Sequence, residues 1–309
     1  MKKRAQSITK SYDRAVHSDY LIHWTGKDID RKYDPKWYND YYHFRKPPHQ
    51  RIIEPYLNRL RDILTYGLWM TIETKANRTF NIGAAEVIAP ATPQCCFTEL
   101  RLSESRRHAK KYGRLGIGFK RPFLFERFGR PLAYFGYHKE KHKDQFFEAC
   151  KTDLQDKRLL NFFKPMNSTR ELVYDLYSES EWRILYFDQL LKDRKIIDPR
   201  DSANAKEHAY FNSLNAIQQR KLKYLIPLDA WFAMVIHPSA TTKNLVLWTL
   251  SGRPSAPQHG IAREIATEVE RIKSNRADRV NRVRGEGLEL PYNGGNWPHQ
   301  IELDACRHF

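Results

Sequence analysis

Residues 95–100 read CCFTEL, and residues 112–120 read YGRLGIGFK. The first run is short and apolar and ends in a threonine and a carboxylate, which is typical of a strand that presents polar groups at its end. The second run carries three glycines within six residues, next to aromatic side chains, and predicts a loop that faces a ligand. We expect the strand and the loop to form one wall of a site that is completed from elsewhere in the chain.

The composition indicates a folded protein with a polyanionic partner. The chain has 309 residues, of which 41% are hydrophobic and 13% aromatic, enough to build a sizeable core. It carries 53 Lys and Arg against 36 Asp and Glu, a net charge of +17. Residues 101–143 alone hold 13 basic and 3 acidic residues. This excess favours RNA, DNA or anionic lipid as a partner, and the alternative is a basic protein whose charge serves only solubility.

The cysteines and the hydropathy pattern indicate a cytoplasmic protein without a membrane partner. The four cysteines, Cys95, Cys96, Cys150 and Cys306, lack metal-ligand spacing and are expected to be reduced thiols, with no metal bound. The basic start, MKKR, is followed by polar residues instead of an apolar signal segment. No apolar run approaches the ~20 residues that a membrane-spanning helix needs.

Helix signals occur at four places. Residues 53–66 have apolar side chains at helical spacing, with Pro55 in the first turn and Gly67 at the end. Ser239 is a candidate cap for a helix that continues to residue 250. Apolar spacing also predicts helices over residues 261–272 and about 144–163.

The remaining segments predict strands and loops. Strands are expected at residues 20–25, 131–137 and 182–187, loops at 192–208, and an irregular segment at 282–309. Residues 224–228 and 231–236 are either two strands or a strand and a turn of helix. In residues 27–50, aromatic and basic side chains alternate; they either stack bases and bind phosphates or fix a loop to the core.

The pattern as a whole predicts an α+β fold. We expect a compact mixed or antiparallel β core flanked by helices, with a helical C-terminal extension. The boundaries predicted are an N-terminal arm at 1–19, an α+β domain at 20–252, and a C-terminal helix with an irregular tail at 253–309.

Three polar groups stand at strand ends, where a sheet can expose reactive side chains. They are His23, the Thr98-Glu99 pair, and Glu179 with Glu181. Each alone is more often a structural residue than a functional one. The glycine-rich run matches neither a phosphate-binding loop, because no Gly-Lys-Ser/Thr follows, nor the spacing of a dinucleotide fingerprint.

The order of these pieces resembles the AbiGi-type family of abortive phage-infection proteins. The resemblance covers about residues 20–190 and is carried by CFTE at 96–99, YGRLGIGF at 112–119 and ESEWR at 179–183. It implies the antitoxin half of a two-part system. The same order is more distantly similar to ADP-ribosyltransferase folds of the His–aromatic–Glu kind, including toxins that modify nucleic acids, and this implies a core of that type.

The more distant resemblance implies NAD as a substrate. Loss of nicotinamide leaves a sugar with oxocarbenium character, which a carboxylate can stabilise. The resemblance then gives Glu181 the role of catalytic carboxylate, with Glu179 orienting the acceptor or sharing a proton. The NAD-binding residues implied are His23, Thr25, Phe97, Thr98, Tyr112 and Arg183, with Tyr112 stacking on nicotinamide.

The basic face gives the expected nucleic-acid contacts. They are Arg106, Arg107, Lys110, Lys111, Arg114, Lys120 and Arg121. Three functions stay open from the sequence. The first is an anti-phage ADP-ribosyltransferase acting on RNA or DNA. The second is a non-catalytic antitoxin or regulator that binds nucleic acid or a toxin. The third is a nuclease or glycosidase that uses Glu179, Glu181 and His23 without NAD.

Overall fold

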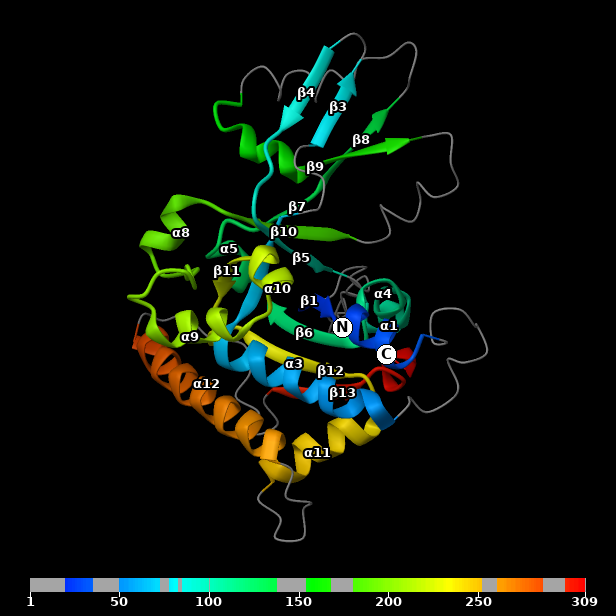
Figure 1. Cartoon of the computed structure of the whole chain (residues 1–309), viewed down its shortest axis with the longest axis vertical. Coiled ribbons are helices and arrows are strands. Elements are labelled where there is room, and N and C mark those ends of the chain that lie inside the picture. The colour runs from blue at the N-terminus through cyan, green and yellow to red at the C-terminus, as the bar shows by residue number, and fades with distance from the viewer. Residues whose placement is uncertain are drawn as a thin grey trace, which may run out of the picture.

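The computed structural model describes residues 20–35, 50–72, 78–82, 85–99, 101–137, 154–167, 180–251, 260–285 and 298–308. The expected arm at 1–19 and most of the aromatic and basic segment at 27–50 lie outside these residues. Figure 1 shows a sheet in the middle of the molecule, helices below it, and two small pairs of strands above it.

The main sheet is mostly antiparallel, so the predicted α+β class is confirmed. Its strand order is β11-β2-β5-β1-β6-β12-β13, and β10 pairs with both β5 and β7. Only the β12–β13 pair is parallel among the described strands of this sheet. The strands are β1 (Tyr20–Thr25), β2 (Leu68–Thr71), β5 (Gln94–Thr98), β6 (Leu115–Lys120), β7 (Arg130–Pro131), β10 (Glu181–Leu185), β11 (Leu222–Ile226), β12 (Phe232–His237) and β13 (His299–Glu302).

Two further strand pairs lie outside the main sheet. The antiparallel pair is β3 (Arg78–Ile82) with β4 (Ala85–Ala89), and the parallel pair is β8 (Ala133–Tyr137) with β9 (Phe163–Asn167). The predicted single strand at 131–137 is therefore divided between β7 and β8. The structure also divides the expected helix at 144–163: residues 144–153 lie outside the described part, and 157–162 form a 3-10 helix, η4 (Lys157–Phe162), that leads into β9.

The described helices are packed around the main sheet (Figure 1). They are α1 (Lys27–Tyr33), α3 (Ile53–Tyr66), α4 (Ser105–Tyr112), α5 (Pro122–Phe125), α8 (Asp188–Lys192), α9 (Ala205–Ser213), α10 (Ala216–Lys221), α11 (Ala240–Leu250) and α12 (Gly260–Gly285). The short 3-10 helices are η2 (Gln50–Ile52), η3 (Leu102–Glu104) and η5 (Ala305–His308). The predicted helices at 53–66, 239–250 and 261–272 are confirmed, and Ser239 caps α11 by accepting a hydrogen bond from the Thr242 amide.

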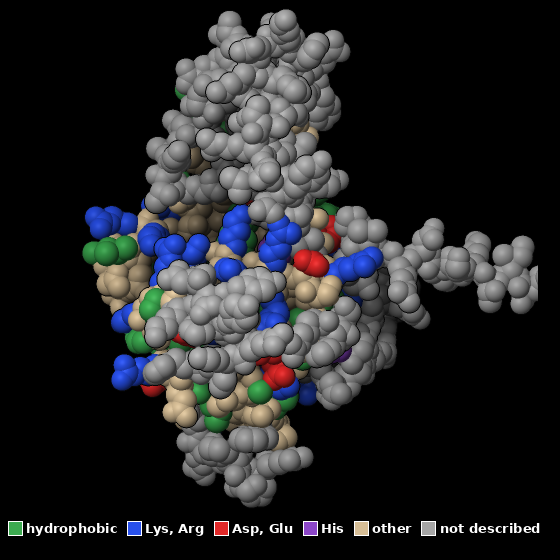
Figure 2. Space-filling view, turned by 90° about the vertical axis from the view of Figure 1, so that its right-hand side faces the viewer, with side chains coloured by type: hydrophobic (Ala, Val, Ile, Leu, Met, Phe, Trp, Pro, Cys, Tyr) green, Lys and Arg blue, Asp and Glu red, His purple; other side chains and the backbone are tan. Residues whose placement is uncertain are grey.

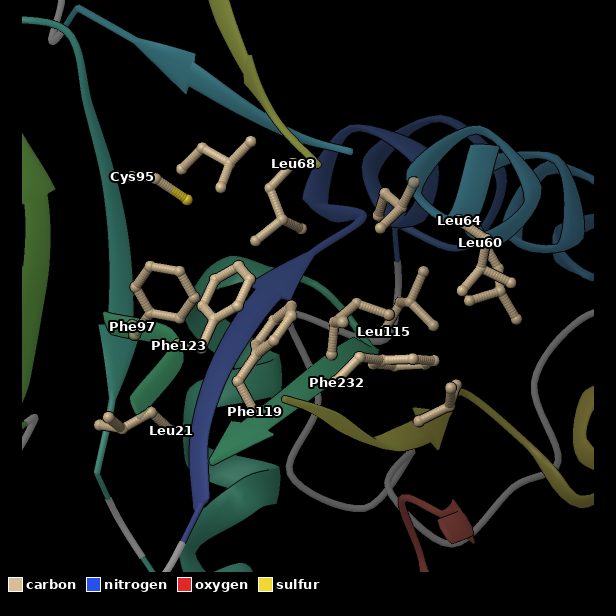
Figure 3. Packing of buried hydrophobic residues seen from close by; sticks show 14 of the residues in the cluster. Leu21, Leu60, Leu64, Leu68, Cys95, Phe97, Leu115, Phe119, Phe123 and Phe232 are labelled. Carbon is tan, nitrogen blue, oxygen red and sulfur yellow. The ribbon is translucent and has the colours of Figure 1, made fainter. Parts of the chain in front are cut away.

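The main core lies between one face of the sheet and helices α3 and α12. Leu57 and Leu60 of α3 are buried with Ile265 of α12 and with strand residues such as Leu115. Figure 3 shows the aromatic part of this core, in which Phe119 and Phe123 stack with ring centroids 4.0 Å apart. A smaller cluster that includes Trp24, Ala109 and Cys306 covers the other face beneath α4. Burial of these side chains, at about 1.5–3 kcal/mol each, stabilises both layers.

The glycine-rich run is a central strand, so its prediction as a loop is wrong. Gly116 and Gly118 belong to β6, which pairs with β1 on one side and β12 on the other. A Cβ atom at Gly118 would lie 2.8 Å from the Met234 Cβ, and one at Gly116 would lie 3.1 Å from side-chain atoms of Ile22 and Trp24. These glycines therefore make room for side chains of neighbouring strands.

The segment at 282–309, expected to be irregular, contributes a strand to the main sheet. Residues 282–285 continue α12, and β13 pairs with β12 in register from Met234–His299 to His237–Glu302. Local apolar patterning could not predict β13, because its four residues are all only half-buried. The domain boundaries at 19 and 252 stay predictions.

Candidate functional site

A pocket of about 410 Å³ opens where the sheet divides beside β5. One edge of β5 pairs with β10 along its whole length. On the other edge, β2 pairs only through Thr71–Gln94 and β1 only through Ile22–Thr98. The middle of β5 therefore faces a gap between β1 and β2. Residues of β1, β2, β5, α4, β9 and β10 line the pocket.

His23 of β1 crosses this gap with a hydrogen bond. Its Nδ1 lies 2.9 Å from the backbone oxygen of Cys96. Because a carbonyl oxygen only accepts, Nδ1 carries the proton and Nε2 is left as an acceptor in the neutral ring. Burial lowers the pKa of His23; the hydrogen bond to Cys96 partly opposes this effect and Arg59 adds to it. The ring is thus fixed in one tautomer on the pocket wall.

Glu181 is the first residue of β10, and its carboxylate contacts two cations in the pocket. Arg183 Nε donates to Oε1 at 2.7 Å, and Lys164 Nζ donates to Oε2 at 2.9 Å. Burial favours the neutral acid, but the charges and hydrogen bonds of Arg183 and Lys164 outweigh it and lower the pKa of Glu181 to about 2. The carboxylate is ionised at neutral pH and cannot serve there as a general acid.

Arg183 is held in turn by the chain beyond the pocket. It is fully buried, and its Nη1 donates to the backbone oxygen of Asn161 at 2.7 Å. Asn161 lies in η4, where its side chain donates to the Pro90 and Arg158 carbonyls. The orientation of the Glu181 carboxylate therefore depends on η4 as well as on β10.

Helix α4 supplies the aromatic wall. His108 and Tyr112 lie four residues apart and so share one face of the helix, with ring centroids 6.1 Å apart and nearly parallel planes. The helix ends because Gly113 takes a φ of 116°, where a Cβ atom would lie 2.3 Å from the Thr25 oxygen. Tyr112 is consequently placed in the last turn, against the pocket and still exposed.

The structure brings most of the predicted pocket residues together. The predicted residues on the pocket wall are His23, Phe97, Thr98, Tyr112, Glu181 and Arg183. Thr25 is not among the lining residues, and its hydroxyl accepts a hydrogen bond from Arg59 at 2.9 Å. Glu179 lies outside the described residues.

Sequence reasoning missed several residues of the wall. They are Trp24, Trp69, Gln94, His108 and Lys164. The spacing of four between His108 and Tyr112 was a signal that α4 presents both rings together. Lys164 carried no such signal, because it reaches Glu181 through the pairing of β9 with β8 and the turn of η4.

The predicted basic surface is centred on α4. Arg107 and Lys111 are exposed, whereas Arg106 and Lys110 are half-buried. Arg106 also forms an ion pair with Asp304 at 2.8 Å. Figure 2, which faces the side of the molecule where α1 and α4 lie, shows Lys and Arg side chains gathered across its middle.

Arg114 does not belong to that surface, contrary to the prediction. It is buried, and it forms ion pairs with Asp30 at 2.8 Å and Asp34 at 2.9 Å. Its backbone amide donates to the Tyr56 hydroxyl, which donates to the Gly26 oxygen at 3.1 Å. The guanidinium therefore links α1 to the start of β6.

Lys120 and Arg121 have local contacts at the other end of β6. The Lys120 ammonium lies 4.0 Å from the centre of the Tyr20 ring, and Arg121 forms an ion pair with Glu99. Both side chains are only half-buried. Their contact with a nucleic acid stays a prediction.

The geometry favours binding of an anionic group in this pocket. The charged side chains that line it are Glu181, Lys164 and Arg183, which together leave one positive charge in excess. Neutral His23 offers an acceptor, and the rings on α4 offer a stacking surface for a planar group.

Among the described residues, no group of three or more His, Cys, Asp or Glu side chains is placed to hold a metal ion. None of the helices in the described ranges is long and apolar enough to cross a membrane.

Comparison with known proteins identifies the family. A family model described as "Putative abortive phage resistance protein AbiGi, antitoxin" matches residues 70–230. No curated protein and no solved structure matches the chain. The matched region contains β5, α4, Lys164 and Glu181, and thus most of the pocket wall. Because the match spans just over half of its length, the chain belongs to the AbiGi family of abortive phage resistance proteins.

Proposed function

We propose that this chain acts as the antitoxin of an abortive-infection system and that it works by binding. The observation that carries the proposal is the family match over residues 70–230, whose description names an antitoxin. An antitoxin implies a cognate toxin as partner. We place the complex in the cytoplasm, where the reduced state of the described cysteines is expected.

The electrostatics of the pocket support binding over chemistry. A carboxylate that stabilises a sugar cation acts through its negative charge. At Glu181 that charge is already matched by Lys164 and Arg183, at 2.9 and 2.7 Å. An arriving cation would meet a net positive surface, whereas a phosphate or carboxylate group would be attracted to it.

The α4 surface, defined as Arg107, Lys110 and Lys111, is the proposed contact with the toxin. These side chains lie on a helix next to the pocket mouth formed by Tyr112. Such a basic surface suits an acidic face on a protein partner and accelerates association through long-range attraction.

ADP-ribose transfer from NAD to a nucleic acid is the second candidate. The observation that favours it is that His23, Tyr112 and Glu181 line one pocket, although they are separated by up to 158 positions in the chain. In this reading the Glu181 carboxylate must exchange one of its cations for a ribose hydroxyl when NAD binds.

One experiment separates the two candidates. Cells that express the cognate toxin are scored for colony formation with the wild-type chain or with Glu181→Gln, at equal protein levels. The antitoxin proposal expects equal protection by both proteins. The enzyme reading expects Glu181→Gln to lose protection, and expects purified wild-type protein to transfer label from NAD to total RNA, DNA or protein.

Charge reversal provides the positive test of the binding proposal. Replacing Arg107, Lys110 and Lys111 with Glu should abolish protection and toxin binding. The matched control replaces Arg220 and Lys221, which are exposed on α10, with Glu. We expect this control variant to protect the cells fully. Full protection by the α4 variant, or no toxin binding by the wild-type chain, contradicts the proposal. Circular dichroism spectra in the far and near ultraviolet verify that each variant is folded.

A further inference from the structure

A second cavity, of about 480 Å³, lies between the α5–β7 turn, η4 and the start of α8. We call it the aromatic groove and define it by Phe128, Phe162 and Phe187 with Arg130, Arg158 and Lys192. It shares no lining residue with the pocket beside β5. None of its residues belongs to the α4 surface.

Phe128 has a left-handed backbone conformation at an exposed position. Its φ is 55°, in the left-handed region, which costs a residue other than glycine about 1–2 kcal/mol. The turn is fixed by the Gly129 amide, which donates to the Leu124 oxygen at 2.7 Å. In spite of this cost the residue is 41% exposed. Burial in the core therefore does not account for the conformation.

The ring instead builds the wall of the groove. Phe128 meets Phe187 edge to face, with ring centroids 5.9 Å apart. The guanidinium of Arg158, a residue of η4, lies 5.1 Å from the centre of the Phe187 ring. Phe162 closes the same cavity and is nearly buried. The groove thus combines aromatic faces with a cation beside them.

The charge of the groove is positive. Arg130 and Lys192 are exposed at its rim, and Arg158 lies within it. The acidic residue among the lining side chains is Asp188, which already accepts hydrogen bonds from Tyr186 at 2.8 Å and pairs with Arg158 at 3.5 Å. Arg158 also pairs with Asp156 at 2.8 Å, so Arg130 and Lys192 at the rim are the cations that favour a polyanion.

From these observations we propose that the aromatic groove binds single-stranded nucleic acid. Unpaired bases stack on aromatic faces, and neighbouring Lys and Arg side chains contact the phosphates. A duplex would keep its bases stacked on one another and out of reach of Phe128. The inference does not rest on the antitoxin proposal, because it concerns another surface and another ligand.

Fluorescence anisotropy with the full-length protein tests the proposal. The probes are labelled oligo(U) and oligo(dT) of about 12 nucleotides, a length within the range that one such surface covers, and a duplex of equal length. We expect both single strands to bind more tightly than the duplex. The ratio of the two affinities shows whether the groove prefers RNA or DNA.

Phe128→Ala should weaken single-strand binding about tenfold, in line with the loss of one stacked base. Phe128→Tyr should bind as the wild type does. The matched control is Phe125→Ala, because Phe125 is 48% exposed on the neighbouring α5 but faces Trp182 and does not line the groove. This control should leave affinity unchanged.

Reversal of charge at Arg130 and Lys192 should weaken binding and reduce its salt dependence. The proposal is overturned if no single strand binds, if the duplex binds equally well, or if Phe128→Ala matches Phe125→Ala. It is also overturned if only reversal of the α4 surface abolishes binding. If Phe128→Ala does not fold, the reversal of Arg130 and Lys192 still tests the groove, and wild-type affinity in that variant overturns the proposal.

Discussion

His237 is a buried histidine of β12 that should make stability depend on pH. Its Nε2 lies 2.5 Å from Gln300 Oε1 of β13. Burial lowers its pKa to about 4; Gln300 opposes this shift and Lys243 adds to it. Between pH 6.5 and about 4 the unfolded chain binds a proton that the folded chain does not bind at this site. The free energy of unfolding therefore falls as the pH falls, by about 3 kcal/mol across this window.

His237→Gln removes that proton-binding site and keeps a hydrogen-bond donor for Gln300. We expect the difference in unfolding free energy between pH 7.5 and 4.5, measured with urea, to shrink by about 2–3 kcal/mol in this variant. His208→Gln, at a half-buried position on α9, is the control. An unchanged pH dependence in His237→Gln would refute the assignment.

At the same scale, sequence alternation predicted one partner of Glu181 but not the other. Arg183 lies two residues further along an extended segment, so its side chain points to the same side, and its Nε is 2.7 Å from the carboxylate. Lys164 reaches the other oxygen from a strand of a different sheet. Its approach depends on tertiary packing, which no spacing within the sequence encodes.

Among the elements, β6 gives a direct test of why a strand contains glycine. Gly118→Ala places a Cβ atom 2.8 Å from the Met234 Cβ, which belongs to the paired strand and cannot rotate away. We expect destabilisation of about 1–3 kcal/mol from this overpacking. At Gly260, a Cβ atom meets nothing within 4 Å, and Gly260→Ala should not lower the melting temperature. Equal melting temperatures for both variants would contradict this packing.

The same element explains why sequence reasoning failed there. Three glycines close together usually mark a loop, because glycine is poorly represented inside strands. Two of the three, Gly116 and Gly118, lie in β6, and the space they leave is filled by side chains of β1 and β12, strands that are at least 90 positions away on either side. The helices at 53–66 and 261–272 were predictable because their apolar residues face one partner and recur with the period of a helix.

For the whole molecule, the ion pairs of Arg114 join α1 to the start of β6, and the hydrogen bonds of the Tyr56 hydroxyl add α3. Arg114→Met takes the guanidinium away from the fully buried Asp30 carboxylate and should lower the free energy of unfolding by about 3–5 kcal/mol. Asp30→Leu combined with Arg114→Met should recover most of this loss. Lys273→Met, which removes an exposed ion pair on α12, should cost about 0.5 kcal/mol or less. Urea denaturation of the four proteins checks the order, and a double variant as unstable as Arg114→Met would contradict it.

The overall class was accessible from sequence, but the division of the sheet at the pocket was not. Strand and helix patterns predicted the α+β class and several elements. The gap beside β5 arises because single residue pairs, Thr71–Gln94 and Ile22–Thr98, hold its two ends to different strands. Such register depends on pairing between segments that are far apart in the chain.

The ion pairs of Arg114 also restrict how the sequence can change over generations. Replacement of Arg114 alone takes the guanidinium from Asp30 and Asp34, and replacement of Asp30 alone takes one of two carboxylates from Arg114, whereas replacement of both removes the most deeply buried pair together. Selection for folded protein therefore removes the single-step intermediates. Homologous chains should accordingly keep both residues or lose both, so that positions 30 and 114 are inherited as one unit.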